Sequence, residues 1–298
     1  MTTVDIGSAD RLTKDRPTAR PTRSDSARRA RTTRILLVAP LGVVVLLAII
    51  GPWITPYNPR LVVGSPSLSP GGKFWLGTDA SGLDVFSRVL AATRINMEIG
   101  VLVTLLSTSV GILVGLLVGM NESRRGPIGL LARGLARSVD LVQAIPAVVI
   151  GLVVVAFYGA STTTLVFAIA VIIAPLQARL VRTEVLRVRS EAYLEAGRVA
   201  GLSEFRLTIR HVLPNSSWPA LENTAFVFGV AIILTAALGF LGVGLPPPTP
   251  EWGVMLASGA ADASVGRWWS ALFPAAALGL AVSSVALAYS AVSRRGGA

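Results

Sequence analysis

Six long apolar stretches restrict most strongly what this sequence can fold into. An α-helix needs about 20 apolar residues to cross a hydrocarbon core. The stretches occupy residues 35–54, 99–120, 141–157, 161–178, 223–245 and 268–293. Only 14% of the residues are charged, whereas soluble domains average about 25%. The sequence therefore predicts an all-α integral membrane protein with six transmembrane helices.

The basic residues are divided unevenly between the two sides of this predicted membrane protein. If the spans alternate in direction, 22 of the 27 Lys and Arg residues lie on one side, together with both termini. Basic loops stay on the cytoplasmic side and meet anionic lipid headgroups there. We therefore predict cytoplasmic N- and C-termini. The same distribution explains the net charge of +11 without a nucleic-acid partner, whose groove would gather these charges on one folded face.

Composition shifts divide the chain into segments. The N-terminal residues are rich in Arg, Ser, Thr and Pro, which is typical of a disordered tail. The first apolar stretch is longer than a signal-peptide core, and no clear cleavage site follows it, so we expect an uncleaved anchor. The predicted segments are a basic cytoplasmic tail (1–34), the anchor (35–54), an external loop (55–94), a five-helix core (95–293) with a cytoplasmic loop at 183–222, and a cytoplasmic C-terminus (294–298).

The residue inventory argues against several kinds of chemistry. The sequence has no cysteine, so thiol chemistry is excluded. It has one histidine, His211, which supplies at most one member of a metal cluster or a catalytic triad. No GxxxxGK[ST] phosphate-binding loop is present, so the chain is not expected to hydrolyse ATP. The spans hold neutral polar residues such as Gln177 but no mid-membrane carboxylate of the kind that ion-coupled carriers use. We expect no catalytic, cofactor-binding or metal-binding residue.

Two predicted external segments are rich in turn-forming residues. FWLGTDASGLDVFSRVL (74–90) contains Asp79 and Asp84, which favour turns and helix caps over a calcium site, since two carboxylates are few for that ion. The stretch GFLGVGLPPPTPEWGVML (239–256) contains four prolines, which exclude a regular helix there. This second loop either caps a translocation path or forms a rigid interfacial turn.

Glycines recur at four-residue intervals in the second apolar stretch. Gly111, Gly115 and Gly119 would lie on one face of a helix. In lipid, such a face lets another helix backbone approach closely. The sequence leaves open whether that helix belongs to this chain or to another subunit.

A polar island, EAYLEAGRVAGLSEFRLTIRHVLPN (191–215), separates two apolar stretches. Helical spacing puts Gly197 and Gly201 one turn apart, which predicts a shallow strip that a partner surface can approach. A rim of charged residues suited to docking surrounds this strip: Glu191, Arg198, Glu204 and Arg206. A second helix runs toward Leu213, and Pro214 is expected to end or bend it. The alternative is a solvated hairpin without a partner, although the length of this loop disfavours an idle linker.

EAGRVAG, followed by LP, resembles the EAA motif of the permeases of ATP-binding-cassette importers. HVLPN, the LGTD block at 76–79 and ALGFLGVGLPPPTPEWGVML are similar to the dipeptide/oligopeptide/nickel branch, and the LGTD block to its second, C-type subunit. The resemblance covers about residues 35–280. It implies a type I importer permease fold. Residue by residue, the motif positions are Glu195, Ala196, Gly197 (where the family usually has alanine), Gly201 and the closing pair Leu213-Pro214.

The resemblance also implies what the protein does. The polar segment would form a coupling helix seated in a groove of an ATPase subunit. The expected complex, in a bacterial cell membrane, contains a homologous second permease, two ATPases that bind ATP and magnesium, and an external substrate-binding protein. Di- or oligopeptides are the expected substrates. An ion-coupled carrier and an intramembrane enzyme are the alternatives from other classes, and the missing carboxylates and catalytic groups disfavour both.

Overall fold

The computed structural model of the chain describes residues 23–293. Apart from two isolated β-bridges, the regular elements of these residues are helices. In chain order they are α1 (Arg23–Ile54), α2 (Val85–Asn121), α3 (Pro127–Ala144), α4 (Ala147–Tyr158), α5 (Thr162–Arg189), α6 (Ala192–Val199), α7 (Glu204–Leu207), the π-helical η1 (Thr208–Val212), α8 (Leu213–Glu222), α9 (Thr224–Leu238), the π-helical η2 (Gly239–Val243), α10 (Trp252–Ala263) and α11 (Trp269–Ser293).

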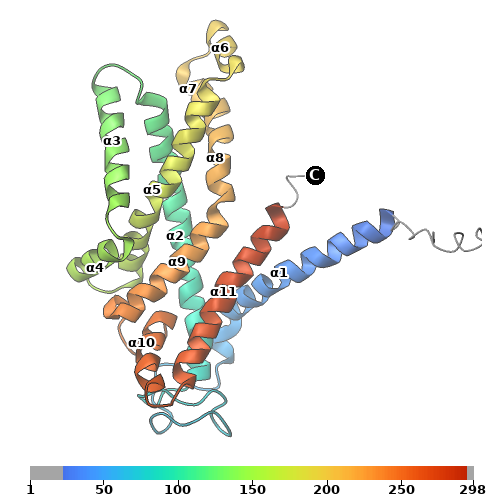
Figure 1. Ribbon diagram of the computed structural model, residues 1–298, viewed down its shortest axis with the longest axis vertical. Coiled ribbons are helices and arrows are strands. Elements are labelled where there is room, and N and C mark those ends of the chain that lie inside the picture. The colour runs from blue at the N-terminus through green and yellow to red at the C-terminus, as the bar shows by residue number, and fades with distance from the viewer. Residues whose placement is uncertain (1–22, 294–298) are drawn as a thin grey trace, which may run out of the picture.

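The helix bundle has two ends, which Figure 1 shows. The end that carries the polar segment 191–215 is called the polar end below. α6 and α7 form the outermost point of the polar end, close to the turn between α2 and α3, and the 55–84 loop and α10 lie at the other. α1 begins at Arg23, so a helix covers part of the predicted disordered tail, consistent with the good helix formers Ala and Arg at 27–31. The rest of that tail, 1–22, and the predicted C-terminus, 294–298, lie outside the described residues.

Within residues 23–293, five helices are long and apolar enough to cross a membrane, or six if a bent pair counts as one span. The bent pair is α3 and α4, which meet at an angle of 97°. The prediction of one helix over 141–157 is therefore wrong. Ile145 has extended backbone angles (φ −87°, ψ 133°), because the ring of Pro146 disfavours a helical conformation in the residue before it.

The glycine stripe of α2 lies against α5 of the same chain. A Cβ atom on Gly115 would lie 2.5 Å from the carbonyl oxygen of Ala178, and one on Gly119 would lie 2.7 Å from Cγ1 of Val185. Gly111 faces the side chain of Gln177 in the same way. The three glycines thus let two backbones approach within one subunit, which the sequence left open.

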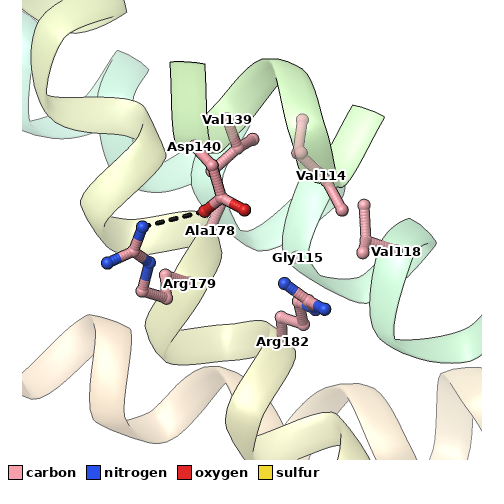
Figure 2. Close-up of a pocket in the computed structure, with 9 residues that line it drawn as sticks. Val114, Gly115, Val118, Val139, Asp140, Ala178, Arg179 and Arg182 are labelled. Carbon is pink, nitrogen blue, oxygen red and sulfur yellow. Dashed lines mark hydrogen bonds and ion pairs between the residues drawn. The ribbon is translucent and has the colours of Figure 1, made fainter. Parts of the chain in front are cut away.

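Ion pairs join α3 and Glu122, the residue that follows α2, to α5. Figure 2 shows Arg179 directed at Asp140, with 2.8 Å between Nη2 and Oδ1. One turn further along α5, Arg182 pairs with Glu122 at 2.7 Å. Because α5 bonds to elements on both sides of the α2–α3 turn, that turn is tied to the α5 helix.

At the opposite end, Asp79 and Asp84 form turns and caps. Oδ1 of Asp79 accepts the N–H groups of Ser81 and Leu83, and Oδ2 of Asp84 accepts the N–H of Ser87 at the start of α2. The buried Arg88 pairs with Asp79 at 3.5 Å and also donates to the carbonyl oxygen of Pro248. The proline-rich loop is therefore bonded to the 55–84 loop through Arg88.

The packing of α2 on α5 generates a testable prediction. We expect Gly115→Ala to destabilise the protein by about 1–3 kcal/mol, because the added methyl group overlaps backbone and side-chain atoms of α5. The matched control is Gly134→Ala in α3, where nothing lies within 4 Å of the added Cβ. The control is expected to be neutral or stabilising by about 0.5–1 kcal/mol. Thermal unfolding of the purified protein measures both, and equal midpoints for the two variants would contradict the packing.

Candidate functional site

The polar island and the helix that follows it, residues 191–222 and called the joint below, project from the end of α5. Glu191 is the N-cap residue of α6, and its carboxylate lies 3.7 Å from Arg187 in the last turn of α5. α6 ends where Gly201 adopts a positive φ of 82°. The N–H groups of Gly201 and Leu202 bond back to the carbonyl oxygens of Arg198 and Gly197, which is a Schellman motif. Gly201 is therefore required by the turn, since other residues rarely adopt this conformation.

Gly197 faces the inside of the joint. A Cβ atom at this position would lie 2.8 Å from Cδ2 of Leu207 and 3.5 Å from Cδ1 of Leu202. The interpretation of Gly197 and Gly201 as one shallow strip for a partner is therefore wrong. The first glycine makes room for α7 and the second forms a turn. The glycine in place of the family's usual alanine thus brings Leu207 closer to α6.

Buried apolar side chains attach the joint to the membrane helices. Leu194 of α6, Leu207 of α7 and Val212 of η1 are buried in one cluster. Ala220 of α8 belongs to the same cluster, which continues into the spans through Val181, Val185 and Val188 of α5 and Met120 of α2. Burying a Leu or Val side chain stabilises by about 1.5–3 kcal/mol. The joint is thus packed onto the ends of α2 and α5 rather than linked flexibly to them.

The helix of the joint does not end at Pro214, because η1 is followed directly by α8. The N–H of Leu213 bonds to the carbonyl oxygen of Thr208, five residues back, so the chain makes a π-turn before the proline. Pro214, which has no N–H to donate, lies directly after this π-turn, in the first turn of α8. Leu213 is partly buried and Pro214 exposed on this continuous helix.

Gln177 of α5 connects the joint to the spans through a second, polar contact. This fully buried side chain donates through Nε2 to Oγ1 of Thr108 in α2 and to the carbonyl oxygen of Ala220 in α8, at 3.0 and 3.1 Å. Its Oε1 accepts the side-chain amide of Asn223 at 3.0 Å. Sequence reasoning saw Gln177 only as a neutral polar residue in a span, because its partners come from helices distant in the chain.

Charged residues cover the outer side of the joint. Nε of Arg198 donates to Glu204 at 2.7 Å, which joins α6 to α7. This hydrogen bond lowers the pKa of Glu204 from its usual value, and the positive charges of Arg198, Arg124 and Arg189 lower that pKa further. Glu195 and Arg206 are exposed. Ala196, beside Glu195 in the motif, is exposed as well.

Two large apolar side chains stand among these charges. The exposed fraction is 87% for Val199 and 77% for Phe205. Sequence reasoning missed Phe205, which lies between the charged Glu204 and Arg206. Its exposure follows from the burial of Leu207 two residues later, because residues two apart in a helix point to different sides. A surface with apolar side chains inside a mixed-charge rim is suited to docking a protein.

Among residues 23–293, no group of three or more His, Asp and Glu side chains is placed to hold a metal ion. What the joint offers is therefore a contact surface outside and a packed attachment inside. The buried cluster connects α6 to α5 and α2, and the ion pair of Glu191 with Arg187 adds a second contact between α6 and α5.

Comparisons with known proteins agree with this geometry. Residues 111–296 match the family model described as binding-protein-dependent transport system inner membrane component. The chain is 36% identical over 251 residues to a di/tripeptide transport system permease protein (DppC) of Pseudomonas aeruginosa, covering 82% of this chain and 80% of that protein. It is 34% identical over 259 residues to a glutathione transport system permease protein (GsiD) of Escherichia coli, covering 86% and 83% of the two chains.

A chain of the methionine ABC transporter MetNI, solved in an inward-facing conformation, shares the fold. Its TM-score is 0.56 at 19% identity, over 70% of this chain and 95% of that chain. The multi-pass helical architecture and the prediction of a type I importer permease fold are thereby confirmed. The family consists of membrane subunits that are not themselves ATPases. The chain therefore belongs to the binding-protein-dependent transport system inner membrane components, the permease subunits of ABC importers.

Proposed function

We propose that this chain is the second, C-type transmembrane subunit of an importer for di- or oligopeptides, and that its joint docks on a cytoplasmic ATPase. ATP and magnesium are held by two ATPase subunits, and this chain binds no cofactor and catalyses no reaction itself. A homologous permease completes the translocation path, and an external binding protein delivers the substrate. The observation that supports the proposal most is the exposure of Val199 and Phe205, the most exposed large apolar residues of a joint whose inner side is packed against the membrane helices.

The position of the joint supports its cytoplasmic orientation. The joint lies at the same end as the α2–α3 turn, and both segments are rich in arginine. Arginine-rich loops mark the cytoplasmic side of a membrane protein. With the joint in the cytoplasm, the 55–84 loop and α10 face outward, toward the binding protein. We place both termini in the cytoplasm on this basis, and we place the protein in a bacterial cell membrane because the relatives come from bacteria.

The interior of the joint supports a mechanical role. ATP-driven closure of an ATPase dimer displaces whatever is docked on it, and a rigid attachment converts that displacement into rocking of the spans. The cluster around Leu194 and Leu207 and the hydrogen bonds of Gln177 supply such an attachment. Val199 and Phe205 supply the docked surface, and Glu195 and Arg206 add charges for specific pairing.

The peptide substrate class rests on the relatives. Their names describe transport of di- and tripeptides and of glutathione, which is itself a peptide. Binding of short peptides to the external binding protein of the same importer is the direct test of this part of the proposal.

The docking surface is tested by Phe205→Asp. We expect this variant to insert and fold normally but to lose most of the ATPase subunit on purification, because a carboxylate replaces an apolar contact at the centre of the interface. The control is Val265→Asp, at a residue that is 67% exposed near α10 at the opposite end. Quantifying ATPase subunits recovered with each tagged variant gives the result. Full recovery with Phe205→Asp would refute docking at this surface.

The attachment of the joint is tested by Gln177→Leu. This change leaves the amide of Asn223 and the carbonyl of Ala220 without their buried partner, at an expected cost of about 1–3 kcal/mol. We expect the complex to assemble and hydrolyse ATP, but to import less substrate per ATP. Gln143→Leu, at an exposed position in α3, is the control. An unchanged ratio of import to hydrolysis would show that this contact does not transmit motion.

A further inference from the structure

A basic pocket lies between the joint and the α2–α3 turn. It is open to solvent, encloses about 510 Å³, and is formed by three separate segments. The α2–α3 turn contributes Ser123 and Arg124, the end of α5 contributes Arg189 and Ser190, and the joint contributes Arg198 and Glu204. The side chain of Arg124 takes part in none of the docking or attachment contacts described above.

The pocket carries an excess of positive charge. Three guanidinium groups surround one carboxylate, that of Glu204. The charges of Arg124 and Arg189 both help to lower the pKa of this carboxyl group, which agrees with their positions around it. Glu204 lines the pocket, and Glu195 also acts on the charge of Arg198. Two carboxylates for three guanidinium groups leave an excess of positive charge that can attract another anion.

Most hydrogen-bond donors of the pocket arginines are not used by described residues. A guanidinium group has five N–H donors. Arg198 uses its Nε on Glu204, and Arg189 uses Nη1 on the carbonyl oxygen of Gly119 at 2.7 Å. The planar, forked guanidinium group fits the oxygens of a phosphate group better than it fits a spherical anion. The remaining donors suit a ligand with several oxygens and at least one negative charge.

We propose that this pocket binds a phosphate-type anion, which bridges Arg124 of the α2–α3 turn to Arg189 and Arg198. Such an anion ties the turn to the joint across a gap that protein side chains leave open. Occupancy then sets how firmly the α2–α3 turn is held against the joint. The phosphate belongs either to the headgroup of an anionic lipid in the adjoining leaflet, where basic segments collect such lipids, or to a free anion in solution.

The test measures hydrogen–deuterium exchange of the nucleotide-free importer in nanodiscs. One arm compares phosphatidylglycerol-containing discs with pure phosphatidylcholine discs. The other adds inorganic phosphate to phosphatidylcholine discs, with chloride at matched ionic strength as reference. We expect slower exchange in the α2–α3 turn and in α6 when the anion is present. Protection only with phosphatidylglycerol identifies a lipid headgroup, and protection with inorganic phosphate identifies a free anion.

Arg124→Gln should remove this protection or weaken the apparent phosphate affinity about tenfold, the size of a lost charge-assisted contact. Arg124→Lys, which keeps the positive charge, should retain part of the protection from exchange. The matched control is Arg125→Gln, at an exposed arginine that does not line the pocket. The proposal is overturned if neither anion gives protection, or if Arg124→Gln and Arg125→Gln behave alike. It is also overturned if Arg124→Gln instead reduces ATPase recovery independently of both anions, because an acidic side chain of that subunit would then fill the pocket.

Discussion

The close approach of α2 and α5 is the constraint on which the rest of the structure depends. Each of the three stripe glycines faces an atom of α5 that a methyl group would overlap, and in lipid such packing replaces the hydrophobic effect as the force between helices. Gly111 also leaves room for the side chain of Gln177, whose buried amide then reaches α2 and α8. The backbone contact and the polar contact thus support each other. A Cβ atom on Gly111 would overlap Cβ of Gln177, so this glycine is needed for the side chain to take its place.

The joint extends this packed pair beyond the membrane helices. Leu194 and Leu207 continue the buried cluster that begins with Val181 and Val185 on α5, so α6 and α7 are seated on the helix pair rather than hinged to it. Their outer side carries Val199 and exposed charges. An importer subunit without an ATP site of its own needs both properties, because the force comes from a different protein and must reach the spans without being absorbed by a flexible link.

The sequence was sufficient for features that depend on local patterns. Most of the apolar stretches became helices. The four-residue spacing of Gly197 and Gly201 was wrongly interpreted as a docking strip, because Gly201 forms the turn that ends α6. The sequence was not sufficient where contacts between residues far apart in the chain determine the structure. Gly197 faces Leu207 of a different helix, Phe205 is exposed because α7 buries its opposite side, and Gln177 acquires a role only through α2 and α8. The third span was expected to be one helix, but Pro146 disfavours a helical conformation at Ile145, and the chain bends by 97° there.

The most direct test of rigid transmission is one distance measured in two states. The natural chain has no cysteine, so spin labels can be placed through Val199→Cys in α6 and Phe167→Cys in the opposite half of α5, both at exposed positions. The axial separation along α5 alone is roughly 30 Å by helix geometry, which suits double electron–electron resonance. In an importer shown to be active, the account predicts the same distance distribution without nucleotide and with ATP trapped. A shift of several ångströms between the two states would contradict it, because the joint would then move relative to α5 instead of with it.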